Sequence, residues 1–493
     1  MPVIFTDGWI KRGKQGLADP GSPCDCDCDC ACPDLPTSNP AGPTPSTYLV
    51  RNPMLQTMPL DATYQTAFIP SGDCVAALDD DAMRVLGAFD RSRSCSDLPS
   101  DWHSAWGDTL YDAVDDLARL RFLIPPGDAP LERPTEGAKT LVAWLHITNA
   151  CNLRCRYCYL RKTNQVMTPE TGRAAIDAIF RSALLHNLSS VKLKYAGGEP
   201  TLNLPLVIAL HEYASGLARQ YGRALEGVVL SNGVRLTHTM IDAMLAHNLR
   251  LMISLDGIGP AHDGQRAFAN GAGSFQAVSR SIERARAKGL TPSISITVTD
   301  RSVDGLAETV GWVLDRNLPF SLNFYRENDA SASFEDLRLG ETRLIEGMQG
   351  AFQAIEAKLP RRSLRATLLD RTNLAAPHNR TCSVGSNYMV VDPQGRISQC
   401  QMQMKQSSSS VQAQDPLASI RARSTGIQNL AVDEKEGCRD CEWRYWCTGG
   451  CPMQTFRATG RYDVQSPNCN IYKALFPGVL RLEGRRLVKY ANA

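Results

Sequence analysis

Residues 151–158 read Cys151-Asn152-Leu153-Arg154-Cys155-Arg156-Tyr157-Cys158, and they follow closely after the apolar run Leu141–Ile147. The run predicts a buried strand, so the three thiols lie together on the loop behind it. A [4Fe–4S] cluster normally takes four cysteine thiolates, and a loop with three leaves one iron open for another ligand. From the residues alone, a zinc site that lacks a nearby fourth ligand is the alternative.

Apolar runs alternate with helical stretches from about Leu141 to Arg326. Strands are predicted at Leu141–Ile147, Val191–Tyr195, Gly227–Leu230, Leu251–Leu255, Ser293–Val298 and Phe320–Phe324. The pair Thr168-Pro169 is typical of a helix start, with a capping residue and a proline in the first turn. Six β/α units predict an α/β fold with a parallel sheet, curved into a partial (β/α)6 barrel. Function is then expected at the C-terminal ends of the strands.

Three further motifs follow the next three predicted strands. They are Gly197-Gly198-Glu199-Pro200, then Ser231-Asn232-Gly233, then Ser254-Leu255-Asp256-Gly257 with His262, Asp263, Arg266 and Gly273-Ser274-Phe275 behind it. Two adjacent glycines permit close backbone approach, and a carboxylate suits an ammonium partner. Each motif therefore stands where a parallel sheet places its ligand-binding groups.

The cluster loop and these motifs, in this order, resemble the radical S-adenosylmethionine (radical SAM) superfamily. The last motif resembles the subgroup that contains anaerobic sulfatase maturases and peptide-modifying enzymes. The resemblance implies that SAM is cleaved reductively to a 5′-deoxyadenosyl radical, which abstracts a hydrogen from the substrate. It also implies these roles: Cys151, Cys155 and Cys158 as the catalytic cluster ligands, and Gly197, Gly198, Glu199, Pro200, Ser254, Asp256 and Arg266 as SAM contacts, with Glu199 at the amino group, Ser254 at the ribose and Arg266 at the carboxylate.

Seven more cysteines lie in a loop-rich region near the C-terminus. They are Cys382, Cys400, Cys438, Cys441, Cys447, Cys451 and Cys469, with Gly395 five residues before Cys400. Zinc knuckles would explain such a group, and a region this poor in apolar pattern needs metal for its fold. The spacing, however, resembles the SPASM domain, which carries two auxiliary [4Fe–4S] clusters.

By this resemblance Cys438, Cys441, Cys447 and Cys469 hold one auxiliary cluster, and Cys382, Cys400 and Cys451 hold the other. With the cluster on the loop, the chain would bind three [4Fe–4S] clusters and SAM. The second auxiliary cluster has only three cysteines, because Ser383–Met389 contains none. Its open iron could bind a substrate thiolate, although Tyr388, a backbone group or water would also fill the site.

One departure separates the chain from sulfatase maturases. In those enzymes an aspartate follows the cysteine of the Gly-x4-Cys element and is the proposed base, whereas Gln401 follows Cys400 here. A glutamine cannot take the proton. Those enzymes also begin close to their cluster loop, whereas about 140 residues precede it in this chain.

The segment before the core predicts a small α+β domain. Short β-like runs at Tyr64–Ile69 and Cys74–Leu78 precede a helix that opens on Asp79-Asp80-Asp81 and another over Leu110–Leu120. The element order resembles, loosely, the PqqD-like, winged-helix-like domain that captures a leader peptide as an added edge strand. A purely structural N-terminal domain is the alternative.

The cysteine content is more informative about function than the net charge is. The 493 residues carry a net charge of +2, which gives no reason to expect nucleic-acid binding. No stretch is long and apolar enough for a membrane helix, and residues 1–7 lack the basic and apolar regions of a signal peptide, so a cytoplasmic location is expected. The 17 cysteines of a reducing compartment then indicate metal ligands.

Five of these cysteines, from Cys24 to Cys32, alternate with Asp25, Asp27, Asp29 and Ala31. A low-complexity tail is the plain interpretation, and a tail that imitates or interacts with a Cys-rich substrate, or receives iron or sulfur, is the alternative. The predicted division is 1–46 disordered Cys/Pro-rich tail, 47–124 PqqD-like domain, 125–139 linker, 140–330 radical SAM core, 331–381 helical connector, 382–475 SPASM domain and 476–493 C-terminal tail.

The sequence thus predicts a radical SAM/SPASM peptide maturase. The expected partners are a precursor peptide, recognised through its leader segment, and an external electron donor of the flavodoxin or ferredoxin type. The expected product is a thioether or carbon–carbon cross-link. Oxidation or epimerisation of a single residue is an alternative within the class. A non-catalytic iron–sulfur or zinc peptide-binding module is an alternative from another class. A radical enzyme that acts on a small molecule is a third alternative.

Overall fold

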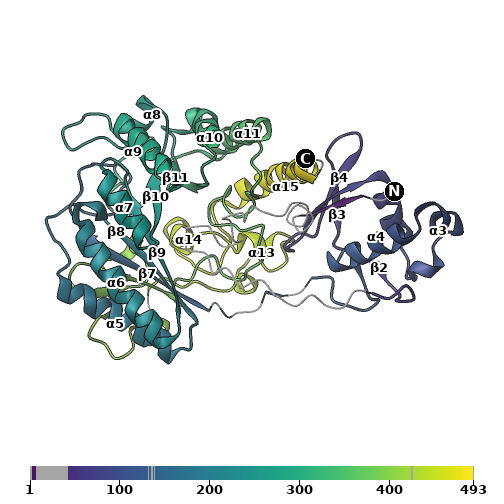
Figure 1. Ribbon diagram of the computed structural model, residues 1–493, viewed down its shortest axis with the longest axis horizontal. Coiled ribbons are helices and arrows are strands. Elements are labelled where there is room, and N and C mark those ends of the chain that lie inside the picture. The colour runs from purple at the N-terminus through teal and green to yellow at the C-terminus, as the bar shows by residue number, and fades with distance from the viewer. Residues whose placement is uncertain are drawn as a thin grey trace.

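A computed structural model describes residues 3–6, 43–131, 133–134, 137, 139–422 and 426–491. In Figure 1 the β/α core lies on the left, a small N-terminal domain lies on the right, and the cysteine-rich C-terminal segments lie between them. None of the helices in the described ranges is both long and apolar enough to cross a membrane.

The core is built on one large sheet whose central strands are parallel. Its predicted strands are β7 Thr140–Thr148, β8 Ser190–Gly197, β9 Ala224–Ser231, β10 Arg250–Ser254, β11 Ser293–Val298 and β12 Phe320–Phe324. They lie in the order β12-β11-β10-β9-β8-β7, and each neighbouring pair is parallel. The prediction of six β/α units with a parallel sheet is confirmed.

Helices connect these strands and cover one face of the sheet. They are α5 Pro169–Leu185, α6 Leu204–Tyr221, α7 His238–Ala246, α8 Pro260–Asp263, α9 Phe275–Ala287 and α10 Leu306–Asp315. The predicted start of α5 is confirmed, because the Thr168 hydroxyl accepts a hydrogen bond from the Thr171 amide at 3.1 Å. Residues of the helix-covered face, such as Leu145 and Tyr195, are fully buried in the main core.

The opposite face of the same strands is more polar. Trp144 pairs with Lys194 across β7 and β8, and Ser254 pairs with Ser295 across β10 and β11. Because side chains alternate along a strand, these residues all face away from the helices that bury Leu145. The polar face and the C-terminal strand ends together form the inner surface of the core.

The C-terminal region adds three strands to this sheet, which the sequence did not predict. Strand β13 Tyr388–Val391 pairs in parallel with β7, and β14 Arg396–Ser398 and β15 Ser409–Ser410 extend the sheet in antiparallel pairs. Strand β13 has only four residues, all fully buried. A four-residue apolar run cannot be distinguished in sequence from a buried turn, so the sequence predicted only loops in this region.

The remaining helices of the C-terminal half are α11 Glu341–Ala357, α12 Pro416–Arg421, α13 Arg444–Cys447, α14 Pro452–Thr459 and α15 Cys469–Ala491. Helix α15 continues through the residues predicted as a C-terminal tail. In the predicted connector, 331–381, α11 is accompanied by irregular chain and one short 3₁₀ turn, Glu335–Leu337. Helix α15 packs on α11 and on strand β5 of the N-terminal domain.

The N-terminal domain is the small α+β unit that the sequence predicts. Its sheet has the order β1-β5-β4-β3, with β1 Ile4–Phe5, β3 Gln56–Pro59, β4 Tyr64–Phe68 and β5 Val75–Asp79. The helices are α2 Asp80–Ala88, α3 Ser100–Trp106 and α4 Asp108–Arg119, and β2 Val50–Arg51 pairs with β6 Leu123–Ile124. Asp79 caps α2 by accepting a hydrogen bond from the Ala82 amide at 2.8 Å.

The predicted disordered tail requires a correction at its start. Ile4 and Phe5 are buried and form a strand of the N-terminal sheet, whereas residues 7–42 lie outside the described residues. Two apolar residues are too few to show a period of either 2 or 3.6, so the sequence could not distinguish this strand from the segment that follows. The Cys24–Cys32 run belongs to the part of the chain that is not described.

The N-terminal domain is fastened to the C-terminal region through its β4–β5 loop. The Ser71 hydroxyl donates to the Glu442 carbonyl and accepts from the Tyr445 amide, and the Trp446 indole donates to the Gly72 carbonyl at 2.6 Å. The Ser71–Tyr445 bond is buried and the other two are partly buried, so breaking them would leave polar atoms unsatisfied.

Replacing Gly484 in α15 by alanine tests this packing. The new Cβ would lie 2.1 Å from the Thr66 hydroxyl of β4, which is buried. We expect Gly484→Ala to lower the free energy of unfolding by about 1–3 kcal/mol, as overpacking does, in urea unfolding. The matched control is Gly216→Ala in α6, where a Cβ meets nothing within 4 Å, and it should stabilise by about 0.4–1 kcal/mol. Equal stabilities would contradict the close packing of α15 on β4.

Candidate functional site

The loop that carries Cys151, Cys155 and Cys158 is held in place by a second segment of the chain, residues 265–269. The Arg154 amide donates to the Ala267 carbonyl at 2.9 Å, and the Arg156 amide donates to the Gln265 carbonyl at 3.1 Å. Leu153, which is fully buried, forms a β-bridge with Phe268. The loop is therefore fixed before any metal binds.

The three thiols of this loop are close enough to affect one another electrostatically. Burial raises the pKa of the Cys155 thiol to about 11, and Cys158 and Cys151 raise this pKa further. Burial also raises the pKa of Cys151, while the nearby Lys162 opposes the shift. The Lys162 ammonium lies 2.9 Å from the Cys158 sulfur. A group of partly buried thiols with a cation beside it suits binding as thiolates to a positively charged metal centre.

The Gly197-Gly198-Glu199-Pro200 motif lies against the start of the cluster loop. The Gly198 amide donates to the Thr148 carbonyl at 2.6 Å, and the Glu199 amide donates to the Ala150 carbonyl at 2.9 Å. A Cβ on residue 198 would come within 2.0 Å of the Ala150 carbonyl oxygen, and Gly197 has φ of +120°. Only glycine allows the end of β8 to approach the loop so closely.

The Glu199 carboxylate is occupied by donors of its own chain. It is 1% exposed, and one oxygen accepts from the Thr201 hydroxyl at 2.6 Å and the Ser231 hydroxyl at 2.9 Å, while the other accepts from the Asn232 amide at 2.7 Å. Burial raises the pKa of this carboxyl, and these hydrogen bonds oppose the shift. Pro200 begins a short 3₁₀ helix, Pro200–Asn203.

The Ser231-Asn232-Gly233 motif connects Glu199 to the cluster loop. The Asn232 side-chain amide donates to the Asn152 side-chain oxygen at 2.7 Å and lies 3.7 Å from the Cys151 sulfur. The ends of β7, β8 and β9 are thus linked through one buried network, which runs from Glu199 through Asn232 to the first cysteine.

The fourth motif contributes a buried ionic group beneath the same loop. The Tyr157 hydroxyl donates to the Asp256 carboxylate and accepts from Arg266, and the Arg266–Asp256 contact is 3.4 Å. Asp256 is 1% exposed, and its other oxygen accepts from the Thr297 amide at 2.8 Å. Ser254 ends β10 on the inner face of the sheet. Arg266 is thus paired within the protein through its terminal nitrogen.

Several buried polar atoms around the loop have no hydrogen-bond partner within the described part of the chain. They are both ring nitrogens of His146, Oδ1 of Asn149, Nε2 of Gln265 and Nε of Arg266. Orphaned buried groups are rare in folded proteins because each costs free energy. Here they belong to residues that neighbour the loop, and they indicate that a polar ligand belongs beside it. Burial lowers the pKa of His146 to about 3, so its imidazole is neutral.

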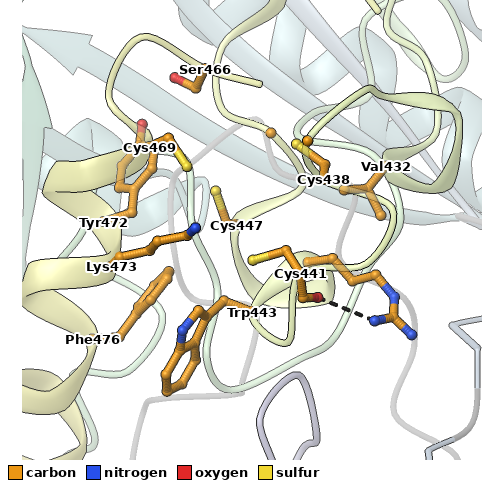
Figure 2. A pocket seen from close by; sticks show the side chains of 13 residues that line it. Val432, Cys438, Cys441, Trp443, Cys447, Ser466, Cys469, Tyr472, Lys473 and Phe476 are labelled. Carbon is orange, nitrogen blue, oxygen red and sulfur yellow. Dashed lines mark hydrogen bonds between the residues drawn. The ribbon is translucent and has the colours of Figure 1, made fainter. Parts of the chain in front are cut away.

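Four C-terminal thiols line one pocket (Figure 2). They are Cys438, Cys441, Cys447 and Cys469. Figure 2 shows the sulfurs of Cys441, Cys447 and Cys469 turned toward one another, with the amino group of Lys473 beside them. Burial, together with the other three thiols of the group, raises the pKa of Cys447 to about 12.

The other three C-terminal cysteines, Cys382, Cys400 and Cys451, form a second group in an apolar environment. Burial raises the pKa of Cys400 to about 12, and the Cys451 and Cys382 thiols add to the shift. Gln401 lies beside this group: its side-chain oxygen accepts from the Tyr388 hydroxyl at 2.8 Å and lies 3.5 Å from the Cys400 sulfur. The structure therefore divides the seven thiols into a set of four and a set of three.

Lys435 lies between the two sets. It is 1% exposed, its ammonium donates to the Thr448 carbonyl at 2.7 Å, and thiols of both sets contribute to its electrostatic environment. Burial lowers its pKa, and the thiols oppose that shift. A buried cation between two groups of thiolates offsets part of their mutual repulsion.

Family comparison identifies the core. Residues 145–312 match the radical SAM superfamily, a range that includes the cluster loop and all three motifs behind it. Residues 145–312 are a radical SAM domain. This bears out the resemblance drawn from the strand-end motifs.

Several proteins of known name are similar to this radical SAM protein. A serine-type anaerobic sulfatase-maturating enzyme of Klebsiella aerogenes is 22% identical over 353 residues, which cover 67% of this chain and 83% of that protein. The Fe-coproporphyrin III synthase of Methanosarcina barkeri is 27% identical over 220 residues, which cover 42% of this chain and 49% of that protein. The chain spans about half the length of the first curated relatives it matches.

A solved structure shares the fold. The structure of anSMEcpe with bound AdoMet and Kp18Cys peptide superimposes with a TM-score of 0.58 at 18% identity, and the match covers 72% of this chain and 99% of that one. At this identity the likeness concerns the fold. It extends well beyond residues 145–312 of the radical SAM protein.

Sequence reasoning missed the residues that have no motif of their own. His146 lies within a predicted strand and reads as a core residue, and Gln265 and Lys435 stand in loops without a recognisable spacing. Only the strand alternation that turns His146 away from the helices, together with its place before the cluster loop, could have indicated it. Tyr157 was visible within the loop, but its bond to Asp256 depends on the fold.

The Glu199 network generates a test. In Glu199→Gln one acceptor oxygen becomes an NH₂ group, which must face the Asn232 amide or the Ser231 and Thr201 donors. We expect the buried mismatch to lower the free energy of unfolding by about 1–3 kcal/mol and to reduce iron bound at the cluster loop, because Asn232 also contacts Cys151. Urea unfolding and iron analysis measure the two effects.

The control for that substitution is Glu212→Gln. The Glu212 side chain is 59% exposed and contacts only the His247 ring among the ion pairs of the described residues. Its loss should change neither stability nor iron content measurably. If Glu199→Gln behaved like this control, the network would not support the cluster loop.

Proposed function

We propose that this radical SAM protein is an enzyme that modifies a side chain of a peptide or protein. The observation that carries the proposal is the cluster loop, with three partly buried thiols and orphaned polar atoms in neighbouring residues. When bound, SAM and a [4Fe–4S] cluster on Cys151, Cys155 and Cys158 supply a radical that removes hydrogen from a substrate.

The residues of this chain would hold and shield that chemistry. Three thiols leave one iron available to SAM, and the free Nε of Arg266 and the free oxygen of Asn149 suit its carboxylate and amino groups. Glu199 is engaged with Thr201, Ser231 and Asn232, so its contribution to SAM binding would include setting the position of Asn232. Ser254, at the C-terminal end of β10, would contact the ribose of SAM.

Two auxiliary clusters would occupy the C-terminal thiol groups. Cys438, Cys441, Cys447 and Cys469 surround one cavity, which suits a cluster with four cysteine ligands. Within the described residues, no three His, Cys, Asp or Glu side chains converge as they would on a single metal ion. An all-cysteine set suits the irons of a cluster, and the cysteine spacing that resembles the SPASM domain favours a cluster over zinc.

The group of Cys382, Cys400 and Cys451 favours a cross-linking reaction. With three cysteines it would leave one iron without a protein thiolate, and a cysteine of the substrate is a suitable fourth ligand. The Tyr388 hydroxyl is already bonded to Gln401, which makes it a poorer candidate for that place. A ribosomally made precursor peptide that contains cysteine is the proposed substrate, with a thioether or carbon–carbon link as the product.

Single-residue oxidation is the second candidate, because the sulfatase-maturating relative matches two thirds of this chain. Gln401 weighs against it. The residue lies beside Cys400 with its side-chain oxygen already accepting hydrogen bonds, and an uncharged amide cannot act as a base. Epimerisation would likewise need a hydrogen donor, for which no buried thiol outside the two C-terminal groups and the cluster loop stands at the strand ends of the described chain.

Metal analysis tests the cofactor assignment. Anaerobically reconstituted protein should contain about twelve iron and twelve sulfide per chain. Replacing Cys151, Cys155 and Cys158 by alanine should remove about four of each and abolish SAM cleavage, whereas replacing Cys438, Cys441 and Cys447 should remove about four and leave SAM binding intact. Zinc in place of iron at the C-terminal sites would contradict the proposal.

Product analysis separates the two candidate reactions. With reductant of the flavodoxin or ferredoxin type and a cysteine-containing precursor peptide, we expect 5′-deoxyadenosine together with a peptide that has lost two hydrogens and one alkylatable thiol. A peptide that instead reacts with a carbonyl reagent would support single-residue oxidation. Absence of 5′-deoxyadenosine from fully loaded protein would favour a non-catalytic binding module.

A further inference from the structure

The first strand of the chain is attached to the N-terminal sheet as a separate peptide would be. Ile4 pairs with Leu78 and Phe5 with Ala77 in an antiparallel ladder at the edge of the sheet, beside β5. The Asp79 carboxylate accepts from the Val3 amide at 3.0 Å, and the Asp79 amide donates to the Val3 carbonyl. Addition of an extended segment to an exposed sheet edge is a common mode of peptide recognition.

Side chains strengthen this attachment. Ile4 is 7% exposed and belongs to the core of the N-terminal domain, whereas Phe5 is 4% exposed and belongs to the main core. The Phe5 ring lies 5.6 Å from that of Tyr64. Strand β1 therefore fills two pockets on opposite sides of the sheet, which is how alternate side chains give specificity to an edge strand.

Thirty-six residues separate this strand from the next described part of the chain. The second attachment is also on the N-terminal domain, where the Ser96 amide donates to the Pro45 carbonyl at 3.1 Å. The five alternating thiols, Cys24 to Cys32, belong to this connecting segment. Both ends of the thiol-bearing segment are thus held on the domain that was predicted to bind leader peptides.

We propose that residues 3–6 act as a leader in cis: they occupy the peptide-binding edge of the N-terminal sheet and hold the Cys24–Cys32 segment on the enzyme as its own substrate. The inference rests on the proposed function and names its substrate class, a cysteine-rich peptide covalently joined to the catalyst.

The length of the connection permits this role. Eighteen residues from Thr6 to Cys24 can span at most about 60 Å, and eleven residues from Cys32 to Pro43 can span at most about 40 Å. The shorter of these reaches is comparable to the width of an ordinary domain. The domain that holds them contacts the C-terminal region through Ser71 and Gly72, next to the elements that carry Cys441 and Cys447. A tethered segment also acts at an effective concentration on the order of millimolar, so a modest intrinsic affinity suffices.

The chemistry balances with SAM as the oxidant. Each thioether replaces one S–H bond and one C–H bond of the segment by one S–C bond. The carbon loses a hydrogen atom, the thiol loses a proton, and bond formation releases one electron. SAM is converted to methionine and 5′-deoxyadenosine by accepting one electron from the external donor and the hydrogen atom from carbon. The electron released by the segment offsets the one supplied, so no further oxidant is consumed.

The first experiment measures binding without cofactors. A fluorescent peptide with the sequence of residues 2–10 is titrated into the full metal-free chain, into Phe5→Asp, and into the control Leu185→Asp, whose site is exposed. We expect at least about tenfold tighter binding to Phe5→Asp, because its sheet edge has been vacated, and a lower thermal unfolding midpoint than that of Leu185→Asp, because a buried ring has been removed. Equal binding to all three chains would overturn the leader assignment.

The second experiment follows the segment itself. Trypsin releases residues 15–51 as one peptide that contains all five thiols. After turnover of the full, cluster-loaded chain with SAM, we expect this peptide to lose two hydrogens and one alkylatable thiol per cross-link, with one 5′-deoxyadenosine for each. Phe5→Asp should retain SAM cleavage and lose the modification. Millimolar residues 2–10 added to the wild-type chain should suppress it too, which covers the case in which the variant folds poorly.

The outcomes distinguish failure of the in-cis substrate proposal from failure of the proposed function. If 5′-deoxyadenosine forms and residues 15–51 stay unmodified, the in-cis substrate is overturned and the proposed function stands. If no 5′-deoxyadenosine forms, the proposed function fails, while the binding experiment still decides the leader role. An isotope-labelled Cys151→Ala chain mixed with active chain should remain unmodified; equal modification of both would show that a second copy is the substrate.

Discussion

The active-site architecture depends on one close approach of two backbones, at the ends of β7 and β8. Gly198 lies so near the Ala150 carbonyl that any side chain there would collide with it. This contact brings Glu199 beneath the cluster loop, and Glu199 in turn orders Ser231 and Asn232 at the end of β9. Because each of these groups is buried, a displacement at one of them leaves donors and acceptors unsatisfied at the others.

The three parts of the chain are joined more tightly than a series of domains on linkers would be. Strand β13 brings the cysteine-rich region into the core sheet, and α15 connects that region to the N-terminal domain. The β4–β5 loop is bonded to the segment between Cys441 and Cys447. Packed elements therefore connect the N-terminal sheet to the region that carries the four thiols.

Sequence reasoning located the parts of the molecule that obey a local rule. The six core strands, the capped start of α5 at Thr168 and the acidic start of α2 at Asp79 follow from patterning and capping, which act within a few residues. The cluster loop and its accompanying motifs were recognisable because their chemistry requires fixed spacings. The family match over residues 145–312 confirms that part.

The features that the sequence did not predict depend on contacts with residues far away in the chain. Strand β13 is too short to be predicted from its sequence, and it forms because it pairs with the edge of β7. Ile4 and Phe5 are buried by residues more than 70 positions away. Lys435 and His146 acquire their environments only when the thiols and the sheet close around them. Such tertiary contacts override local propensity and leave no period to detect.

The parallel pairing of β13 with β7 has a geometric consequence for electron movement. Tyr388 stands opposite Val142 and Val391 opposite Leu145, so the chain leading to the reducing loop and the chain between Cys382 and Cys400 run side by side in the same direction. This pairing therefore helps to set the distance that electrons would cross between the proposed cluster at Cys151, Cys155 and Cys158 and the proposed cluster at Cys382, Cys400 and Cys451, and each residue adds roughly 3.3 Å along the paired strands.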